Sequence, residues 1–267
     1  MSADTQPRIG IIGGSGFYSF FGTGAQQVKV RTPYGDPSAA ITVGDVDGTP
    51  VAFLPRHGVS HEYAPHTVPY HANAWALRSL GVRRIFAPCA VGGLSTDLEP
   101  GTMVIPDQLV DRTSGRSQTF FDGPAVHVAF SDPYCPALRA AAAVAAPDAV
   151  VDGTMVVVEG PRFSTRAESQ MYASQGFTLI NMTGQPEAVL ARELEMCYAS
   201  IALVTDTDAG VVAGEGVTAS EVFAVFEQGL GRMRTMLTAA IGEAARQPEC
   251  LCARGEHDIS DLMDPVS

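Results

Sequence analysis

Arg8-Ile-Gly-Ile-Ile-Gly-Gly-Ser-Gly16 is the stretch of the chain that best indicates its fold. Residues 8–12 form a short run that is apolar after the arginine, as in a strand that is buried on both faces. The glycines that follow, with Ser15 among them, predict a turn in which the backbone can approach a ligand. A buried strand followed by such a turn is typical of α/β proteins, which bind ligands beyond the carboxyl ends of their strands.

Strands and helices alternate along the rest of the chain. Apolar runs predict strands at 51–55, 84–88, 103–105, 154–159, 179–183 and 198–205. Helices are predicted between them, and two begin with a capping box, Thr165 with Glu168 and Thr218 with Glu221. We therefore expect one α/β domain over 8–245, with a central mixed, twisted sheet flanked by helices, and an acidic C-terminal tail over 246–267.

Composition limits the classes of function. The 267 residues are 46% hydrophobic and carry a net charge of −12, which favours a large core and argues against a nucleic-acid partner. No apolar run reaches the roughly 20 residues of a membrane helix. The polar start, residues 1–8, does not resemble a signal peptide, so the cytoplasm is expected.

The five cysteines form no recognisable pattern in the sequence. Cys89, Cys135 and Cys197 are far apart, and Cys250-Leu-Cys252 is too tight for ordinary metal-ligand spacing. We therefore expect neither a disulfide framework nor a metal site.

Each polar strand end, taken alone, has more than one interpretation. The first glycine turn could be a phosphate cradle, a dinucleotide loop or a tight turn, although it lacks the full G-x-G-x-x-G spacing. Arg56-His57 could clamp an anion or be a surface pair. Asp206 and Asp208 could be a metal site, a pair of catalytic carboxylates or caps.

Together the motifs resemble the trimeric methylthioadenosine phosphorylases. The resemblance covers residues 8–245 in one collinear order. It is carried by 10–16, Arg56-His57-Gly58 with His61, Pro65-His66, 70–75, Asp111-Arg-Thr113, Glu159-Gly-Pro-Arg-Phe-Ser164, Asn181-Met-Thr183 with Pro186-Glu187, and Thr205-Asp-Thr-Asp208.

The resemblance implies a nucleoside phosphorylase-like fold and a homotrimer. It also implies a pentosyltransferase of purine and methionine salvage, in which inorganic phosphate, with no cofactor or metal, cleaves 5′-methylthioadenosine. By position, the phosphate ligands would be Ser15, Arg56, His57, Cys89, Ala90 and Thr183. Cys89 departs from the Thr of many relatives, so the backbone of Ala90 would have to suffice there.

The same resemblance assigns the nucleoside side of the site. Met182 would lie along the ribose, Phe163 would stack near the purine, and Asp206 would assist departure of the base as the catalytic residue. Asp208 would accept a hydrogen bond from the amine of adenine. Specificity positions would be Ser164, Ala219, Val222 and, from a neighbouring subunit, His127.

Two other functions remain possible at this point. One is a 6-oxopurine nucleoside phosphorylase acting on inosine or guanosine, since the small residues of 209–217 leave base specificity open. The other is a dinucleotide-binding oxidoreductase built on the first glycine turn, which the missing third glycine weakens.

Overall fold

The strands form one 11-stranded sheet in the part of the chain that the structure describes. The structure is a computed structural model and describes residues 6–14, 21, 24–123, 125–209, 218–248, 250, 252 and 257–263. The strands are β1 (Ile9–Gly13), β2 (Gln26–Val28), β3 (Ile41–Val46), β4 (Thr49–Pro55), β5 (Arg84–Gly93), β6 (Met103–Ile105), β7 (Gln108–Arg112), β8 (Val150–Val151), β9 (Thr154–Val158), β10 (Leu179–Asn181) and β11 (Cys197–Thr207). The helices are α1 (Tyr70–Ser79), α2 (Pro136–Ala145), α3 (Arg166–Ser174), α4 (Gly184–Glu193), α5 (Ala219–Ala245) and α6 (Ser260–Met263).

The sheet is mixed and branches at β5. Its main path runs β2-β3-β4-β1-β5-β10-β9-β7, and β11 pairs with β5 on the other side and continues to β6 and β8. β1 is parallel to both β4 and β5, whereas β10 is antiparallel to β5. This confirms the predicted mixed sheet.

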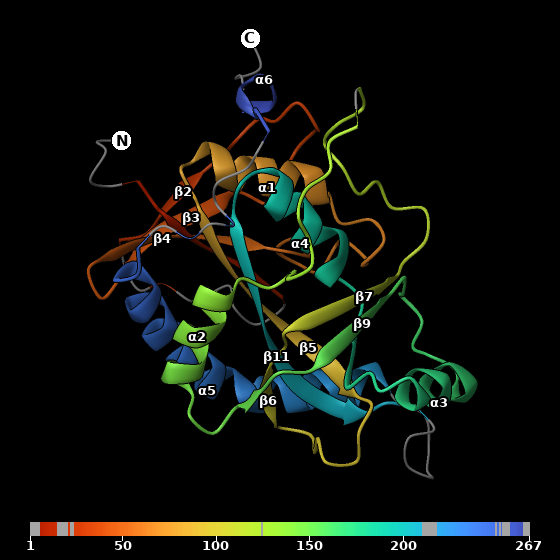
Figure 1. Cartoon of the computed structure of the whole chain (residues 1–267). Coiled ribbons are helices and arrows are strands. Elements are labelled where there is room, and N and C mark those ends of the chain that lie inside the picture. Colours follow the sequence, from red (N-terminus) through yellow and green to blue (C-terminus); the bar gives the residue numbers. More distant parts are fainter. Residues whose placement is uncertain are drawn as a thin grey trace.

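Helices cover both faces of the sheet (Figure 1). One hydrophobic cluster joins Ile9 and Ile11 of β1 to α2 and α5, and a second joins Ile12 to α1 and α4. Successive side chains of β1 therefore pack on opposite faces of the sheet, with the period of two expected of a strand that is buried on both faces. None of the described helices is both long enough and apolar enough to cross a membrane.

Helix ends follow the local sequence. Both predicted capping boxes form, at the starts of α3 and α5. After α1, Gly81 takes a φ of +100°, and the N–H groups of Gly81 and Val82 donate to Arg78 and Leu77. This is the Schellman arrangement that favours glycine after a helix.

The prediction that the strand beginning at Arg84 ends at Pro88 is wrong, because β5 continues to Gly93. β1 pairs only with 84–86 and β10 only with 92–93, so the middle of β5 has no strand on that side. The carbonyl of Pro88 faces this gap, where Arg56 binds it, and the proline nitrogen faces the same way. No ladder hydrogen bond is lost there, which explains why a proline is tolerated.

β11 also continues past the predicted end, through Asp206 to Thr207. A register shift between Val204 and Asp206 places Thr205 in a bulge and Asp206 opposite Gly92. The strand predictions did not include β2, β3, β7 or β8. β2 and β7 lie at the two ends of the main path, and β8 lies at the end of the branch through β11 and β6. Edge strands are half-exposed and carry polar residues, so their hydrophobic pattern is weak.

Candidate functional site

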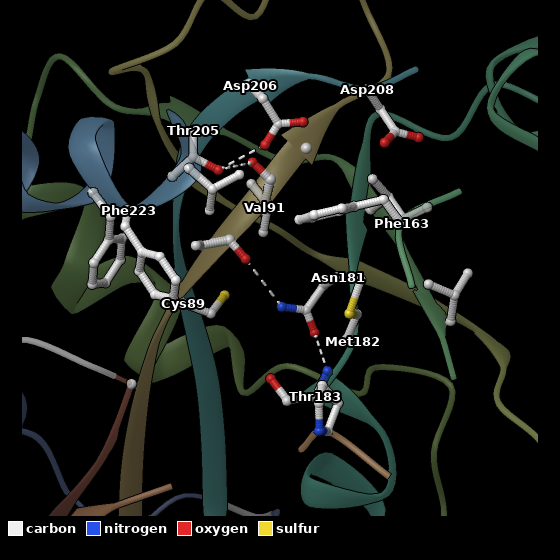
Figure 2. Close-up of a pocket in the computed structure, with 18 of the residues that line it drawn as sticks. Cys89, Val91, Phe163, Asn181, Met182, Thr183, Thr205, Asp206, Asp208 and Phe223 are labelled. Atoms are coloured by element: carbon white, nitrogen blue, oxygen red, sulfur yellow. Dashed lines mark hydrogen bonds between the residues drawn. The ribbon is translucent and has the colours of Figure 1, made fainter. Parts of the chain in front are cut away.

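A cavity of about 200 Å³ lies where the sheet opens beside β5. The carboxyl ends of β1 and β10 approach this opening from opposite directions, because β1 is parallel and β10 antiparallel to β5. Figure 2 shows Asp206 and Asp208 at one end of the cavity and Thr183 at the other, with Phe163 and Met182 between them. The strand order therefore brings distant segments to one point.

Arg56 lies at the end of the cavity that β1 and β4 form. Its side chain is 2% exposed, and Glu187 accepts hydrogen bonds from its Nε and Nη2 at 2.8 and 2.9 Å. Nη2 also donates to the carbonyl of Ile12 and Nη1 to that of Pro88. Burial alone would lower the pKa of Arg56, but the charge of Glu187 raises it overall. The guanidinium is thus charged, fixed in place and able to donate a further N–H from Nη1.

The start of α4 supplies polar groups next to Arg56. The side-chain oxygen of Asn181 accepts hydrogen bonds from the backbone N–H groups of Thr183 and Gly184, each at 2.7 Å. Its Nδ2 donates to the carbonyl of Ala90 at 3.3 Å. Because a strand residue points its N–H and C=O to the same side, the N–H of Ala90 is directed at the same opening. Thr183 is buried and lines the cavity.

His57 and Cys89 contribute no net charge to this end. The Nδ1 of His57 donates to the carbonyl of Tyr63 at 2.8 Å, and burial, with the charge of Arg56, lowers the pKa of His57 to about 4. The Cys89 thiol lies 3.3 Å from the Ser200 hydroxyl, and burial raises its pKa. Both side chains are therefore neutral at pH 7.

Met182 and Phe163 form the middle of the cavity. Gly160 lies beside Met182 with a φ of +64°, which favours glycine, and a Cβ there would lie 2.6 Å from the Met182 sulfur. The buried Arg116 holds the backbone here, donating to the carbonyls of Met182 and Gln185 at 2.9 and 2.6 Å. The sequence reading missed Arg116, which stands outside every motif that carried the resemblance.

Two carboxyl groups lie at the far end of the cavity. Burial is the main cause that raises the pKa of Asp206 to about 6, and the nearby Asp208 adds to it, while a 2.8 Å hydrogen bond from Thr205 opposes the shift. Burial likewise raises the pKa of Asp208, which accepts a 2.5 Å hydrogen bond from Ser169. Asp206 can therefore hold a proton near neutral pH.

The cavity wall opposite β10 is apolar. Val222, Phe223 and Phe226 come from the first turns of α5, and the ring of Phe223 meets that of His61 edge to face with 5.9 Å between centroids. Phe223 is 46% exposed, which is unusual for a phenylalanine and places it at the mouth of the cavity.

Most of the residues predicted for the site line this one cavity. They are Arg56, His57, Cys89, Ala90, Phe163, Ser164, Met182, Thr183, Asp206, Asp208 and Val222. Ser15 lies outside the described residues, next to Gly14, which lines the cavity. His127 and Ala219 are exposed and are not among the described residues that line it.

The structure adds residues that sequence reasoning did not assign to the site. Glu187, Asn181 and Ser169 each hold an assigned residue through a buried hydrogen bond. Glu187 and Asn181 stood within the resembling motifs, so they carried a signal, whereas Ser169 stood only in a predicted helix. Gly92 lines the cavity between Ile180 and the two aspartates.

Comparison with known proteins gives consistent matches along nearly the whole chain. The model of the Phosphorylase superfamily matches residues 8–242. An S-methyl-5′-thioadenosine phosphorylase of Mycolicibacterium smegmatis is 65% identical over 242 residues, which cover 91% of this chain and 93% of that protein. A purine nucleoside phosphorylase of Streptomyces coelicolor is 51% identical over an alignment that covers 94% of this chain and 95% of that protein.

Solved structures agree with the sequence relatives. A methylthioadenosine phosphorylase from Schistosoma mansoni, in complex with adenine, is similar to this chain with a TM-score of 0.85 and 36% identity. The match covers 91% of this chain and 93% of that structure.

Proposed function

This chain belongs to the phosphorylase superfamily, and we propose that it uses inorganic phosphate to cleave 5′-methylthioadenosine into adenine and 5-methylthioribose 1-phosphate. The resemblance inferred from the motifs is thereby confirmed. As a pentosyltransferase with phosphate as co-substrate, it would need no cofactor and would serve purine and methionine salvage in the cytoplasm.

One observation carries the proposal. A single cavity has a fixed cation and directed hydrogen-bond donors at one end and a carboxyl group with a raised pKa at the other. Phosphorolysis needs an anion on one side of the anomeric carbon and a proton donor for the departing base on the other.

The Arg56 end is our proposed phosphate site. Nη1 of Arg56, the N–H of Ala90 and the hydroxyl of Thr183 would donate to the phosphate oxygens, and Ser15 would add a hydroxyl. Glu187 neutralises the charge of Arg56, so selectivity for phosphate would come from the direction of these donors rather than from net charge. The neutral His57 and Cys89 would pack beside the phosphate without repelling it.

The middle of the cavity fits the sugar and the purine face. Met182 would lie along the ribose, and Phe163 would stack near the purine. As phosphate oxygen bonds to the anomeric carbon, the electron pair of the glycosidic bond passes to the purine. The sugar then carries oxocarbenium character, which the adjacent phosphate dianion stabilises.

Asp206 would act as the general acid. Protonated Asp206 would donate to the imidazole-ring nitrogen of the leaving purine, which then departs as neutral adenine and leaves the carboxylate behind. Burial, the cause of its raised pKa, keeps this proton available near neutral pH.

Asp208 would set the choice of base. The hydrogen bond from Ser169 fixes its carboxylate, which would accept from the exocyclic amine of adenine, beside Ser164. A protonated Asp208 would instead donate to a 6-oxo group. The Streptomyces coelicolor relative is named a purine nucleoside phosphorylase, so activity on inosine or guanosine is the alternative to be tested.

The 5′ end of the nucleoside would meet the apolar wall of α5. Val222 and its neighbours suit a methylthio group, and Ala219 would extend this wall. His127 lies outside the cavity of its own chain, so we propose a homotrimer in which a neighbouring subunit supplies it.

A substrate panel with and without phosphate tests the proposal. We expect adenine release from methylthioadenosine only when phosphate is present, with a kcat/KM about 10²-fold above that for inosine. Release without phosphate would indicate a hydrolase. A higher kcat/KM for inosine would establish the alternative and remove the argument from Asp208.

A further inference from the structure

Four of the five cysteines meet at one point, although the sequence spacing gave no sign of it. Cys135 immediately precedes α2, Cys197 begins β11, and Cys250 and Cys252 belong to the C-terminal segment. Their four sulfur atoms all lie within 4.8 Å of one another. Cys197 and Asp206 are at opposite ends of β11, about 30 Å apart along a strand, so this cluster is separate from the cavity described above.

The sulfur distances suit coordination better than disulfide bonding. They are 3.0 Å between Cys250 and Cys252, 3.3 Å between Cys197 and Cys252, and 3.6 Å between Cys135 and Cys250. A disulfide bond is about 2.05 Å long. A tetrahedron of thiolates about 2.3 Å from zinc has sulfur atoms about 3.8 Å apart, which is the scale of this cluster.

We propose that Cys135, Cys197, Cys250 and Cys252 bind a structural zinc ion as a tetrahedral set of thiolates. Four protein ligands leave no open position, so the ion would stabilise the fold and take no part in phosphorolysis. Each coordinating thiol would give up its proton to solvent as zinc binds.

Two of the ligands are held rigidly before any ion binds. Cys135 and Cys197 are buried in the cluster that packs α2 and α5 on the sheet. The backbone N–H of Cys135 donates to the carbonyl of Tyr198 at 2.7 Å, which fixes Cys135 beside the start of β11. A preformed half-site of this kind lowers the entropy cost of coordination.

Nearby cations also favour a thiolate site. Arg8, Arg83 and Arg84 line a neighbouring cavity with Cys197 and Cys250. These cations offset the net negative charge that four thiolates leave around one zinc ion.

The ion would anchor the C-terminal segment. Arg84 donates to the carbonyls of Ala244, Gln247 and Pro248 at the end of α5. Beyond the cysteines, the carbonyl of Glu193 accepts a 2.7 Å hydrogen bond from His257, and the indole of Trp75 donates to the carbonyl of Leu262. In the sequence, Cys250 and Cys252 therefore stand between described residues that contact Arg84 and described residues that contact α1 and α4.

Metal analysis of the full-length protein tests the proposal, with Cys89→Ser as the matched control. We expect about one zinc per chain in the parent and in Cys89→Ser, and a loss of at least about tenfold in Cys252→Ser. A chelator should lower the Tm of the parent by about 5 °C or more and leave the Tm of Cys252→Ser unchanged. Equal zinc in all three proteins would overturn the assignment of these ligands.

A second measurement on the parent covers the case in which Cys252→Ser does not fold. After removal of metal under reducing conditions, added Co²⁺ should give the intense visible bands and sulfur-to-metal charge-transfer bands of a tetrahedral thiolate site. Zn²⁺ should then abolish these bands. No cobalt spectrum, or disulfide bonds found by alkylation and mass spectrometry in protein as purified without metal, would overturn the proposal.

Discussion

Asp206 is the residue whose surroundings bear most directly on the proposed chemistry. It directly follows the β11 bulge at Thr205, accepts a hydrogen bond from Thr205, and its pKa is raised to about 6 mainly by burial. An amide in its place can still accept from Thr205 but cannot donate an acidic proton.

We expect Asp206→Asn to lower kcat by about 10² to 10⁴, the usual contribution of a general acid. The parent kcat/KM should fall as pH rises through about 6, because the proton-donating form is lost there. Phosphate also titrates in this range, so the comparison is between parent and variant profiles. A parent profile that matches the variant's, or an unchanged kcat, would remove Asp206 from the mechanism.

The same substitution should stabilise the protein at neutral pH. The folded pKa is raised above the usual 3.8, so the folded state binds more protons and the free energy of unfolding of the parent falls as pH rises from about 4 to about 6. Asn does not ionise, so its burial does not lower stability in this way. We expect Asp206→Asn to have a free energy of unfolding about 1–3 kcal/mol higher than that of the parent at pH 7, and this difference should disappear below about pH 4. Denaturant unfolding at the two pH values measures it, and equal stability at pH 7 would contradict the burial argument.

The sequence allowed many residues that line the cavity to be predicted but not their environments. The resemblance of the motifs pointed to Arg56 and Asp206, whereas the buried partner Glu187 and the bulge at Thr205 are consequences of packing. Whether a carboxyl group is charged depends on burial, which arises only when distant segments meet.

At the scale of elements, β5 organises the site. Its middle has no strand on one side, and this opening receives Arg56, Asn181 and the proposed phosphate. At its end, Gly92 allows β10 and β11 to approach, since a Cβ there would lie 2.8 Å from Ile180 and 3.2 Å from the carboxylate of Asp206.

Gly92→Ala should therefore displace Ile180 or Asp206. We expect kcat/KM to fall by about 10-fold to 10²-fold, with a loss of about 1–3 kcal/mol in the free energy of unfolding from overpacking. Gly231→Ala is the control, because no atom other than those of its chain neighbours and its own helix backbone lies within 4 Å of the Cβ position in this exposed turn of α5. The control should keep full activity, and its free energy of unfolding should rise by about 0.5–1 kcal/mol. Full activity in Gly92→Ala would show that the close approach is not needed.

The strand bounds could be predicted less well than the strands themselves. A proline and a run of small residues suggested that the strand ends at Pro88, yet a strand can continue through a proline where it lacks a neighbour. Whether a strand has a neighbour at a given residue depends on the strand order of the sheet, which local sequence patterns do not contain.

At the scale of the whole molecule, His127 can distinguish a monomer from an oligomer in which neighbouring subunits share each active site. It is exposed and lies outside the cavity of its own chain. We expect light scattering to give the mass of three chains and His127→Ala to raise KM for methylthioadenosine. If His127 acts in a neighbour's site, mixing His127→Ala chains with Asp206→Asn chains should restore activity. Some mixed sites would then take an intact Asp206 from the first chain and an intact His127 from the second. No recovery in mixed assemblies would contradict the shared site.

A crystal structure of the protein with phosphate and adenine bound would test the central claim most directly. We predict phosphate oxygens within hydrogen-bonding distance of Arg56 Nη1 and the Thr183 hydroxyl, and a ring nitrogen of adenine within hydrogen-bonding distance of Asp206, in the same cavity. Phosphate bound away from Arg56, or adenine with no contact to Asp206, would contradict the account.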